Sequence, residues 1–336
     1  MTGKYGIPYF NNMLNSDMNP EDVRSMCCRL NLDLRELRKR GGGLFGSGEN
    51  TGSIGVVTLD LPRFGYQAET KEELLSIIEE YMELAKDSLE RKRDYLNKYV
   101  LGTGLIPAYD EYVGPLRNHF STIGLVGMNE MCQNFLEEGI ASQEGHQLSL
   151  DILDFMREKC KDFQEETENF YNLEATPAES TAYKLAKRDK EKYQDIYTKQ
   201  GDNEEVYYTN SCHMPVDKVQ NLKHLFEHQN ELQPKFTGGT VIHSYLDGGI
   251  SGEQAKHIIK TACENYKAPY ISLTPVHSIC EEHGYISGFV ETCPICGKEV
   301  ASYQRITGYI RQIDNFNPGK QAEFYDRNQL GSEIND

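Results

Sequence analysis

The spacing of apolar residues along the chain predicts helices separated by short strands. Between residues 70 and 99 apolar side chains recur every three or four positions, which predicts a long amphipathic helix. The apolar side of this helix is expected to hold Leu74, Ile77, Ile78, Tyr81, Met82 and Leu84. Further helices are predicted over 147–171, 178–198, 217–228 and 252–266. Acidic residues after Pro20 predict another helix start there.

Short runs rich in β-branched residues predict strands between these helices. The run SIGVVTLDL, residues 53–61, lies between Gly52 and Pro62 and predicts a buried strand. Other strands are predicted over 207–210, 240–245 and 270–273. The last two flank the predicted helix 252–266, and this order indicates a βαβ unit and an α/β fold. We expect a boundary near residue 275, where a cysteine-rich tail begins.

Composition and charge narrow the class of protein. The chain has 336 residues, 38% of them hydrophobic and 26% charged, which is typical of a soluble globular protein with a substantial core. The sequence contains no apolar run long enough to span a bilayer and no secretory signal, so we expect a cytoplasmic protein. The net charge of −17 argues against general binding to nucleic acid or to an anionic membrane. A local cluster can still hold a phosphorylated substrate.

The cysteines point to metal or redox chemistry. Nine cysteines in a cytosolic chain favour such chemistry over a disulfide framework. Two ligand pairs with two intervening residues each have the layout of a tetrahedral zinc site: Cys280 and His283, then Cys293 and Cys296. Gly284 and Gly297 follow the pairs, as a knuckle turn requires. Four protein ligands leave no open position, so the predicted site is structural. His277 lies near but lacks the two-residue spacing.

A glycine shortly after this cluster, Gly308 in the segment RITGY, is a candidate for storing a radical. Loss of a hydrogen atom from a glycine Cα leaves an electron shared with the flanking amide nitrogen and carbonyl, and no side chain twists it out of plane. The Cα–H bond then has about the strength of a cysteine S–H bond, so the two residues can exchange a hydrogen atom at little cost. The segment alone is a weak signal. A metal that fixes the preceding stretch would give it an exact place.

Two adjacent cysteines, Cys27 and Cys28, are candidate partners for this exchange. They cannot easily bond to each other or ligate one ion together. Transfer of a hydrogen atom requires the protonated thiol, and the apolar neighbours Met26 and Leu30 would keep the thiol pKa high. A small core residue is, however, the commoner fate of a free cysteine. Residue chemistry alone leaves both interpretations open.

Two further segments can hold an anion. Residues 209–215 end a predicted strand and lead into a helix, a place where ligands bind in α/β folds, so Asn210, Ser211 and His213 are candidate substrate contacts. The Asn-Ser pair is equally an ordinary helix cap. The glycine-rich residues 41–48 can cradle a phosphate, but they match neither a P-loop nor a dinucleotide fingerprint. A turn-rich connection is the simpler interpretation of that segment.

Taken together, these motifs resemble the anaerobic (class III) ribonucleoside-triphosphate reductases, a family of glycyl radical enzymes. The resemblance extends from Gly6 to about Arg327. It rests on the segments GIPYFNN, RSMCCRLNLDLRELRKRGGGLFGSGENTGSIGVVTLD, FSTIGLVGMNE, YYTNSCHMPV, FTGGTVIH, SICEEHGY, CPICG and QRITGYIRQIDNFNPGKQAEFYDR.

The resemblance implies a fold and a set of residue roles. The chain would form the C-terminal half of a ten-stranded α/β barrel around a cysteine-tipped finger loop, with a small zinc-ribbon-like segment. Residues 1–275 would be the catalytic half-barrel, 276–300 the zinc knuckle, and 301–336 the radical loop and tail. Gly308 would store the radical and pass it to Cys28, which aligns with the family's cysteine-arginine step; Cys27 is the alternative. The thiyl would take the 3′-hydrogen of a ribonucleoside triphosphate, and the 2′-hydroxyl would leave as water.

The resemblance also implies partners. Family members are considerably longer and carry the N-terminal half of the barrel, often after an ATP-binding regulatory domain. We therefore expect a partner chain that supplies that half, and ATP or deoxynucleotide effector sites mainly outside this chain. An iron–sulfur, radical S-adenosylmethionine activating enzyme would install the radical. The reductant would be formate or a thioredoxin-like protein, the assembly a homodimer, and the environment anaerobic.

Two alternatives compete with this interpretation. A formate-lyase-like acyltransferase is disfavoured by the zinc cluster and by the Met-Cys-Cys-Arg context of Cys28. A non-catalytic spare part would dock to an intact reductase and donate only its radical loop. The presence of Cys28 disfavours this alternative, because a radical donor needs only Gly308 and its loop.

Overall fold

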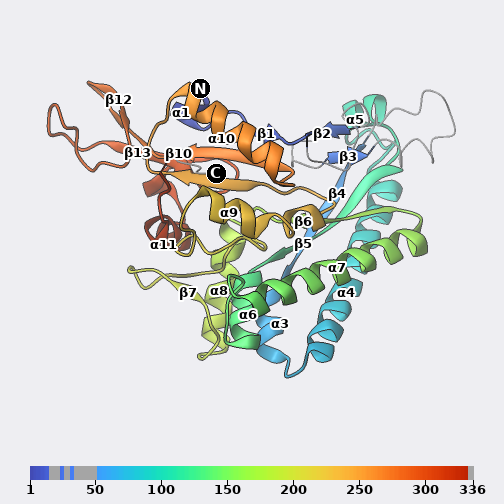
Figure 1. Ribbon diagram of the computed structural model, residues 1–336. Helices are drawn as coiled ribbons and strands as arrows, with labels where there is room; N and C mark the ends of the chain where they lie inside the picture. The colour runs from blue at the N-terminus through green and yellow to red at the C-terminus, as the bar shows by residue number, and fades with distance from the viewer. Residues whose placement is uncertain (15–22, 26–30, 34–50, 332–336) are drawn as a thin grey trace.

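The computed structural model describes residues 1–14, 23–25, 31–33 and 51–331 (Figure 1). Cys27, Cys28 and the glycine-rich segment 41–48 lie outside the described residues, as does Pro20. The chain on either side of the cysteine pair forms two antiparallel strands, β2 (Val23–Ser25) and β3 (Asn31–Asp33). The predicted helix start at Pro20 is therefore followed by a strand rather than by helical residues.

A parallel sheet with the order β4-β5-β6 forms the body of the molecule (Figure 1). Its strands are β4 (Thr51–Asp60), β5 (Asn118–Val126) and β6 (Phe170–Ala175). The helices α3 (Leu61–Gln67), α4 (Lys71–Tyr99), α6 (Met128–Leu136) and α7 (Gln143–Thr167) pack with it in one apolar core. Alternate residues such as Ile123 and Leu173 belong to this core, whereas Thr122 and Asn172 point to the other face and are also buried.

The long predicted helix is confirmed as α4, but its apolar side is narrower than expected. Thr70 caps it by accepting a hydrogen bond from the Glu73 amide. Leu74, Ile78 and Met82 are fully buried, whereas Tyr81 and Leu84 are exposed. The buried stripe continues instead through later turns at i+3 and i+4 spacing: Ala85 and Leu89.

The helix predicted over 147–171 is wrong at its C-terminal end. Helix α7 ends at Thr167, and Glu168 adopts the left-handed conformation with φ 56°. Phe170 then begins the fully buried strand β6. Strand β5 was not predicted, because it mixes polar and apolar residues and is buried along most of its length, so no alternation of period two marks it.

A second sheet confirms the predicted βαβ unit. Strand β9 (Ile242–Leu246), helix α10 (Gly252–Asn265) and the parallel strand β10 (Tyr270–Pro275) follow one another, and β1 (Phe10–Asn11) pairs antiparallel with β10. Helix α9 (Leu222–Gln229) packs in the same core. The segment before β9 connects the two sheets, since the Gly238 amide donates to Leu173 O and the Ala175 amide to Gly239 O. Within the described residues the sheets do not close into a barrel.

A four-stranded antiparallel sheet lies near the C-terminus and extends away from the body at the left of Figure 1. Its order is β12-β11-β13-β14, and its strands are β11 (His277–Cys280), β12 (Gly284–Ser287), β13 (Ala301–Arg305) and β14 (Ile310–Gln312). We call β11, β12 and the residues up to 300 the metal lobe. The predicted boundary near residue 275 coincides with the passage from β10 to β11.

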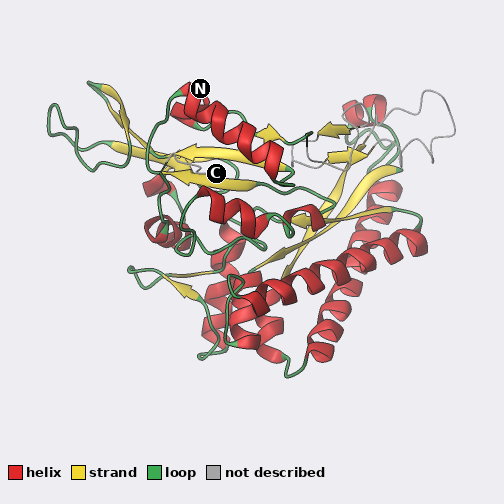
Figure 2. Cartoon of the chain, viewed as in Figure 1, coloured by secondary structure: helices red, strands yellow, loops and turns green. Residues whose placement is uncertain are grey.

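Short elements complete the fold (Figure 2). They are α1 (Thr2–Tyr5), α5 (Pro107–Tyr112), α8 (Ser180–Lys192), β7 (Lys199–Gln200), β8 (Val206–Tyr207), the 3₁₀ turns Gln233–Lys235 and Ile313–Asn315, and α11 (Pro318–Asp326). Among the described residues no helix combines the length and the apolar character that crossing a membrane requires.

Candidate functional site

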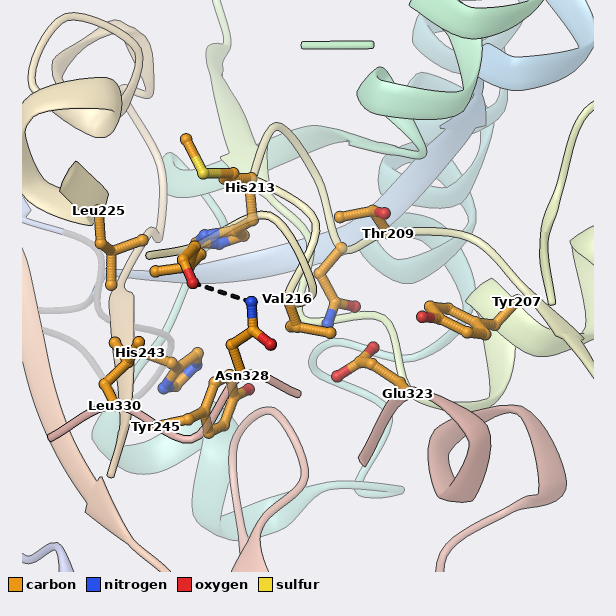
Figure 3. A pocket seen from close by; sticks show the side chains of 13 residues that line it. Tyr207, Thr209, His213, Val216, Leu225, His243, Tyr245, Glu323, Asn328 and Leu330 are labelled. Carbon is orange, nitrogen blue, oxygen red and sulfur yellow. Dashed lines mark hydrogen bonds between the residues drawn. The ribbon is translucent and has the colours of Figure 1, made fainter. Parts of the chain in front are cut away.

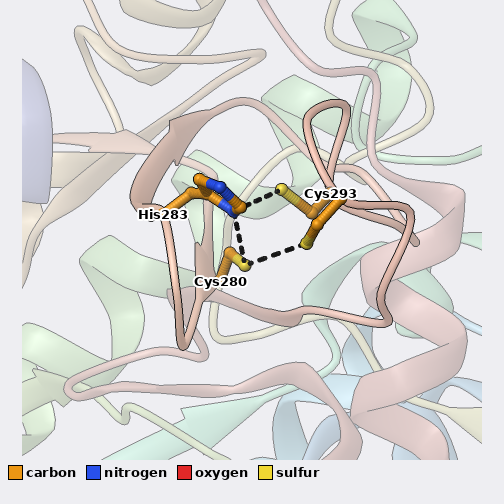
Figure 4. Close-up of side chains that lie close together, drawn as sticks. Cys280, His283 and Cys293 are labelled. Carbon is orange, nitrogen blue, oxygen red and sulfur yellow. Dashed lines mark hydrogen bonds between the residues drawn. The ribbon is translucent and has the colours of Figure 1, made fainter.

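The four predicted metal ligands converge in the metal lobe (Figure 4). Their ligand atoms all lie within 4.8 Å of one another: those of Cys280, His283, Cys293 and Cys296. The His283 Nδ1 atom lies 3.7 Å from the sulfurs of Cys280 and Cys293, and the Cys280 and Cys296 sulfurs are 3.8 Å apart. A tetrahedral zinc ion at about 2.3 Å from sulfur and about 2.0 Å from nitrogen requires separations of roughly 3.5–3.8 Å. The residues therefore fit one zinc ion.

The backbone around the cluster has the form of two knuckles. Gly284 and Gly297 adopt φ values of 74° and 71°, a conformation that side chains disfavour. The Gly297 amide donates to Cys293 O at 2.8 Å and closes the second turn. The backbone N–H of His283 lowers the pKa of the Cys280 thiol, and that of Cys296 lowers the pKa of the Cys293 thiol. Both effects favour the thiolates that bind zinc.

His277 does not take part in the cluster. Its ring is buried and stacks on Tyr285 and Tyr303, with Tyr5 at its edge. Burial lowers the pKa of His277, which keeps the ring neutral among these aromatic side chains.

The metal lobe is joined directly to Gly308. Strand β11, which carries Cys280, pairs with β13, and β13 pairs with β14. Gly308 lies in the turn between β13 and β14, where Arg305 faces Ile310 and the Ile306 amide donates to Tyr309 O. Ile306 is buried in a small apolar cluster with Phe316 and Phe324. We call residues 306–309 the glycine loop.

The fold does not require a glycine at position 308. Its φ lies outside the left-handed region, and a Cβ built on it would meet no atom within 4 Å. A glycine with a structural role shows a positive φ or a close approach, and Gly308 shows neither. Sterics therefore do not explain the glycine at this position.

Two donors converge on the carbonyl oxygen of Gly308. Tyr9 Oη and Arg305 Nη1 each donate a hydrogen bond to it at 2.8 Å. Arg305 Nη1 also donates to Tyr9 Oη at 2.9 Å, and Arg305 Nη2 donates to Gly6 O. The GIPYFNN segment therefore packs against the glycine loop through Gly6 and Tyr9.

A second buried arginine supports the same loop. Arg327 donates to Arg305 O at 3.0 Å and to Ile306 O at 3.1 Å. Its charge is balanced by Glu323 at 2.8 Å, which also pairs with the buried Lys320. Attraction to these two cations outweighs burial and lowers the pKa of Glu323. The network holds the loop through its backbone carbonyls.

A pocket beside the loop is the candidate substrate site (Figure 3). Its cavity volume is about 50 Å³, and it is partly open to solvent. Its walls come from β8, β9, α11 and the segments after β8 and α11, and include Tyr207, Asn210, His213, His243, Tyr245, Glu323 and Asn328. Tyr245 Oη donates to Ile306 O at 3.3 Å, and the Tyr9 ring contacts His243. The pocket wall is therefore continuous with the glycine loop.

The structure places the three predicted substrate contacts differently. Asn210 and His213 line the pocket, whereas Ser211 is fully buried and does not. The segment is fixed by Glu130, whose carboxylate accepts hydrogen bonds from the Thr209 amide at 3.0 Å and hydroxyl at 2.7 Å. Burial raises the pKa of Glu130. Sequence reasoning did not assign this role, although Glu130 ends the FSTIGLVGMNE motif.

A pair of acidic residues was also missed. Asp60, at the end of β4, lies beside the buried Asp189 of α8, and Arg63 bonds to Asp189 and lies 3.4 Å from Asp60. Burial raises the pKa of Asp60 to about 8, and the charge of Asp189 adds to the rise. Asp60 and Asp189 are far apart in sequence, so no local spacing predicts that they lie together.

Comparison with known proteins agrees with this geometry. A family model described as anaerobic ribonucleoside-triphosphate reductase matches residues 1–329. The chain belongs to this family, which is one of oxidoreductases.

The relatives are considerably longer than this chain. An anaerobic ribonucleoside-triphosphate reductase of Haemophilus influenzae is 25% identical over 297 residues, which cover 81% of this chain and 41% of the relative. That of Enterobacteria phage T4 is 26% identical over 312 residues, covering 82% and 48%. A solved structure of an anaerobic ribonucleotide reductase has a TM-score of 0.73 at 25% identity, covering 84% of this chain and 46% of that one. The chain thus spans about half the length of the curated relatives it matches.

Proposed function

We propose that this chain is the catalytic C-terminal part of an anaerobic ribonucleoside-triphosphate reductase. The observation that carries the proposal is Gly308: it lies in a tightly bonded turn beside a pocket, and neither its φ nor its surroundings require a glycine. Family membership supplies the reaction class. Gly308 stores the radical, and the pocket between β8, β9 and α11 holds the substrate.

The proposed reaction begins with hydrogen-atom exchange. The Gly308 radical takes a hydrogen atom from the Cys28 thiol, so that a Cα–H bond forms and an S–H bond breaks; Cys27 is the alternative donor. The thiyl removes the 3′-hydrogen of a ribonucleoside triphosphate, and the 2′-hydroxyl leaves as water. Formate or a thioredoxin-like protein supplies two electrons. Asn210 and His213 are the proposed substrate contacts, while buried Ser211 shapes the backbone between them.

The metal lobe has a structural role in this proposal. Its residues would hold zinc through three sulfurs and one nitrogen, with no position left for substrate. Since β11 pairs with β13, a bound ion would fix the strand that leads into the glycine loop. We propose the domain division at residues 275 and 300 on the same grounds.

We further propose that the chain works together with a segment that supplies the rest of the family's length. That segment would complete the barrel and carry effector sites for ATP or deoxynucleotides, and a radical S-adenosylmethionine enzyme would activate the assembled homodimer. Size-exclusion chromatography tests this need. A compact, well-behaved monomer of the isolated chain would contradict it, because a half-barrel exposes apolar surface and strand edges.

The central test is anaerobic electron paramagnetic resonance. The chain is combined with the N-terminal half of a relative and the activating enzyme, with Gly308→Ala as control. We expect a doublet in the wild type that is absent from the control, followed by ribonucleotide reduction that is lost in Cys28→Ala. A doublet with no reduction, but with rescue of a radical-deficient intact reductase, would instead favour the spare-part function.

A further inference from the structure

The carbonyl oxygen of Gly308 is the meeting point of two donors from distant parts of the chain. Tyr9 Oη and Arg305 Nη1 both lie 2.8 Å from it and 2.9 Å from each other. The Arg305 guanidinium carbon also lies 4.5 Å from the centre of the Tyr9 ring. Tyr9 Oη, Arg305 Nη1 and the Gly308 oxygen thus form a closed triangle of polar atoms. The Ile306 amide also donates to Tyr309 O across the turn.

The charge on Arg305 has no carboxylate partner in the part of the chain that the structure describes. The side chain is 4% exposed, and its donors point to backbone carbonyls and to Tyr9. Arg327, which donates to the Arg305 carbonyl in the same network, is by contrast paired with Glu323. A buried charge without a partner of opposite charge lowers stability, so the presence of Arg305 suggests a functional role. Here the positive charge is directed at the carbonyl oxygen of Gly308.

A radical at the Cα of Gly308 would be delocalised onto this carbonyl group. The unpaired electron is stabilised when the amide nitrogen donates density and the carbonyl accepts it, which places negative charge on the oxygen. Hydrogen bonds to that oxygen strengthen as its charge grows, and more so when the donor is charged. The two donors would therefore stabilise the radical more than the closed-shell glycine.

We propose that Tyr9 and Arg305 are positioning residues that stabilise a radical on Gly308 through its carbonyl oxygen. They would so shift the hydrogen-atom exchange with cysteine towards the state in which the glycine carries the radical. This inference rests on the proposed function, in which Gly308 carries the radical. In the exchange a Cα–H bond breaks as an S–H bond forms, or the reverse, with no other electron or proton released. The donors shift the balance of that exchange without entering it.

The test compares three activated proteins by electron paramagnetic resonance. Tyr9→Phe keeps the ring but removes one donor, so more spin remains on the Cα and the doublet from its hydrogen widens. We expect the radical content to fall about two- to ten-fold, the effect of one lost hydrogen bond. Tyr245→Phe is the matched control, because its hydroxyl bonds to Ile306 O in the same loop but not to Gly308. Its doublet should keep the wild-type splitting.

Electron–nuclear double resonance in deuterated water gives a second readout. The wild type should show exchangeable deuterons coupled to the radical, one of which disappears in Tyr9→Phe. Circular dichroism and zinc content establish that each variant is folded. If Tyr9→Phe does not fold, Arg305→Lys carries the test, since it keeps the charge but loses the paired donor geometry.

The outcomes separate the two proposals. A wild-type doublet with identical splitting and content in Tyr9→Phe, or in Arg305→Lys where that variant replaces it, would overturn the carbonyl role and leave the radical function standing. Equal changes in Tyr9→Phe and Tyr245→Phe would also overturn it, because they would reflect loop position alone. A wild type that gives no doublet would overturn both proposals.

Discussion

The metal lobe and the glycine loop are neighbours on one sheet, yet different kinds of interaction fix their conformations. In the metal lobe four side chains converge and the surrounding surface is open, with Phe289 and Ile295 exposed. In the glycine loop the side chains of Arg305 and Arg327 converge on backbone carbonyls, and Ile306 is buried. We expect the lobe to depend on a bound ion for its order. The loop depends on buried cations of the protein itself.

The difference separates two requirements of the site. A ligand cluster fixes where a strand begins, whereas carbonyl hydrogen bonds fix a backbone segment atom by atom. The lobe supplies a rigid base for β13 through its pairing with β11. The loop then presents Gly308 with its carbonyl bonded and the space beside its Cα open.

Removal of the metal should have the largest effect on stability. Cys293→Ser leaves three ligands and disrupts a site whose binding energy is folding energy, on the order of 10 kcal/mol for a structural zinc site. We expect loss of zinc, local unfolding of residues 276–300 and loss of the glycyl radical signal. Metal analysis, hydrogen exchange of the lobe and paramagnetic resonance would measure these changes.

The matched control is Cys263→Ser, in α10 and outside the cluster. It should retain zinc. A Cys293→Ser protein with full zinc content and a protected lobe would show that the cluster is not the basis of its order.

Arg327→Met should have the next largest effect. It leaves Glu323 buried with only Lys320 as a partner and removes the bonds to Arg305 O and Ile306 O. Breaking a buried ion pair from one side costs about 3–5 kcal/mol of the free energy of unfolding. Denaturant titration measures it.

Arg311→Met provides the comparison on the surface. Arg311 is half exposed and lies 3.6 Å from Glu179, so its loss should cost less than about 1 kcal/mol. Equal losses for the two variants would mean that the buried network does not support the loop.

Asp60→Asn tests a buried carboxyl group that, unlike Glu323, lies beside another acidic residue, Asp189. Burial and Asp189 raise the pKa of Asp60 to about 8. The folded protein then holds a proton that the unfolded chain releases above about pH 4, so this group lowers stability as the pH rises from 4 to 8. The asparagine should add about 1–3 kcal/mol to the free energy of unfolding at pH 8 and little at pH 4.

Urea titrations across this pH range would measure the gain. Asp154→Asn, on the exposed face of α7, should give no such pH-dependent gain. A constant difference between Asp60→Asn and the wild type at every pH would contradict the assignment.

Gly308→Ala should have the smallest effect on stability. A methyl group meets no atom within 4 Å and the φ is ordinary, so the free energy of unfolding should change by less than about 1 kcal/mol. The same variant should lose the radical signal completely. Thermal unfolding and zinc content would measure its integrity, and a severe loss of stability would mean that the glycine is structural after all.

Local patterns predicted the parts of the fold that have local causes. Helix α4 was predicted from the periodicity of its apolar residues, and the four metal ligands from their two-residue spacing. The βαβ unit was predicted from the order of its strands and helix along the chain. Strands β5 and β6 were not predicted, because strands buried along most or all of their length lack an alternation of polar and apolar residues. At β6, in addition, the helical pattern of α7 continues past the end of that helix.

The contacts that define the site have long-range causes. Tyr9 contacts Gly308, and Glu130 contacts Thr209, because elements that are distant in sequence pack together. The pairing of Asp60 with Asp189 has the same origin. Cys27 and Cys28 lie outside the described residues, so their predicted role remains a prediction.

The bond between Arg305 and Gly6 joins residues 299 positions apart. A contact of such separation is slow to form, because bringing its two ends together costs loop-closure entropy. During synthesis the GIPYFNN segment therefore waits, without its partner, until β13 has left the ribosome. The hydrogen bonds around the Gly308 carbonyl can therefore be completed only after both ends of the chain have been made.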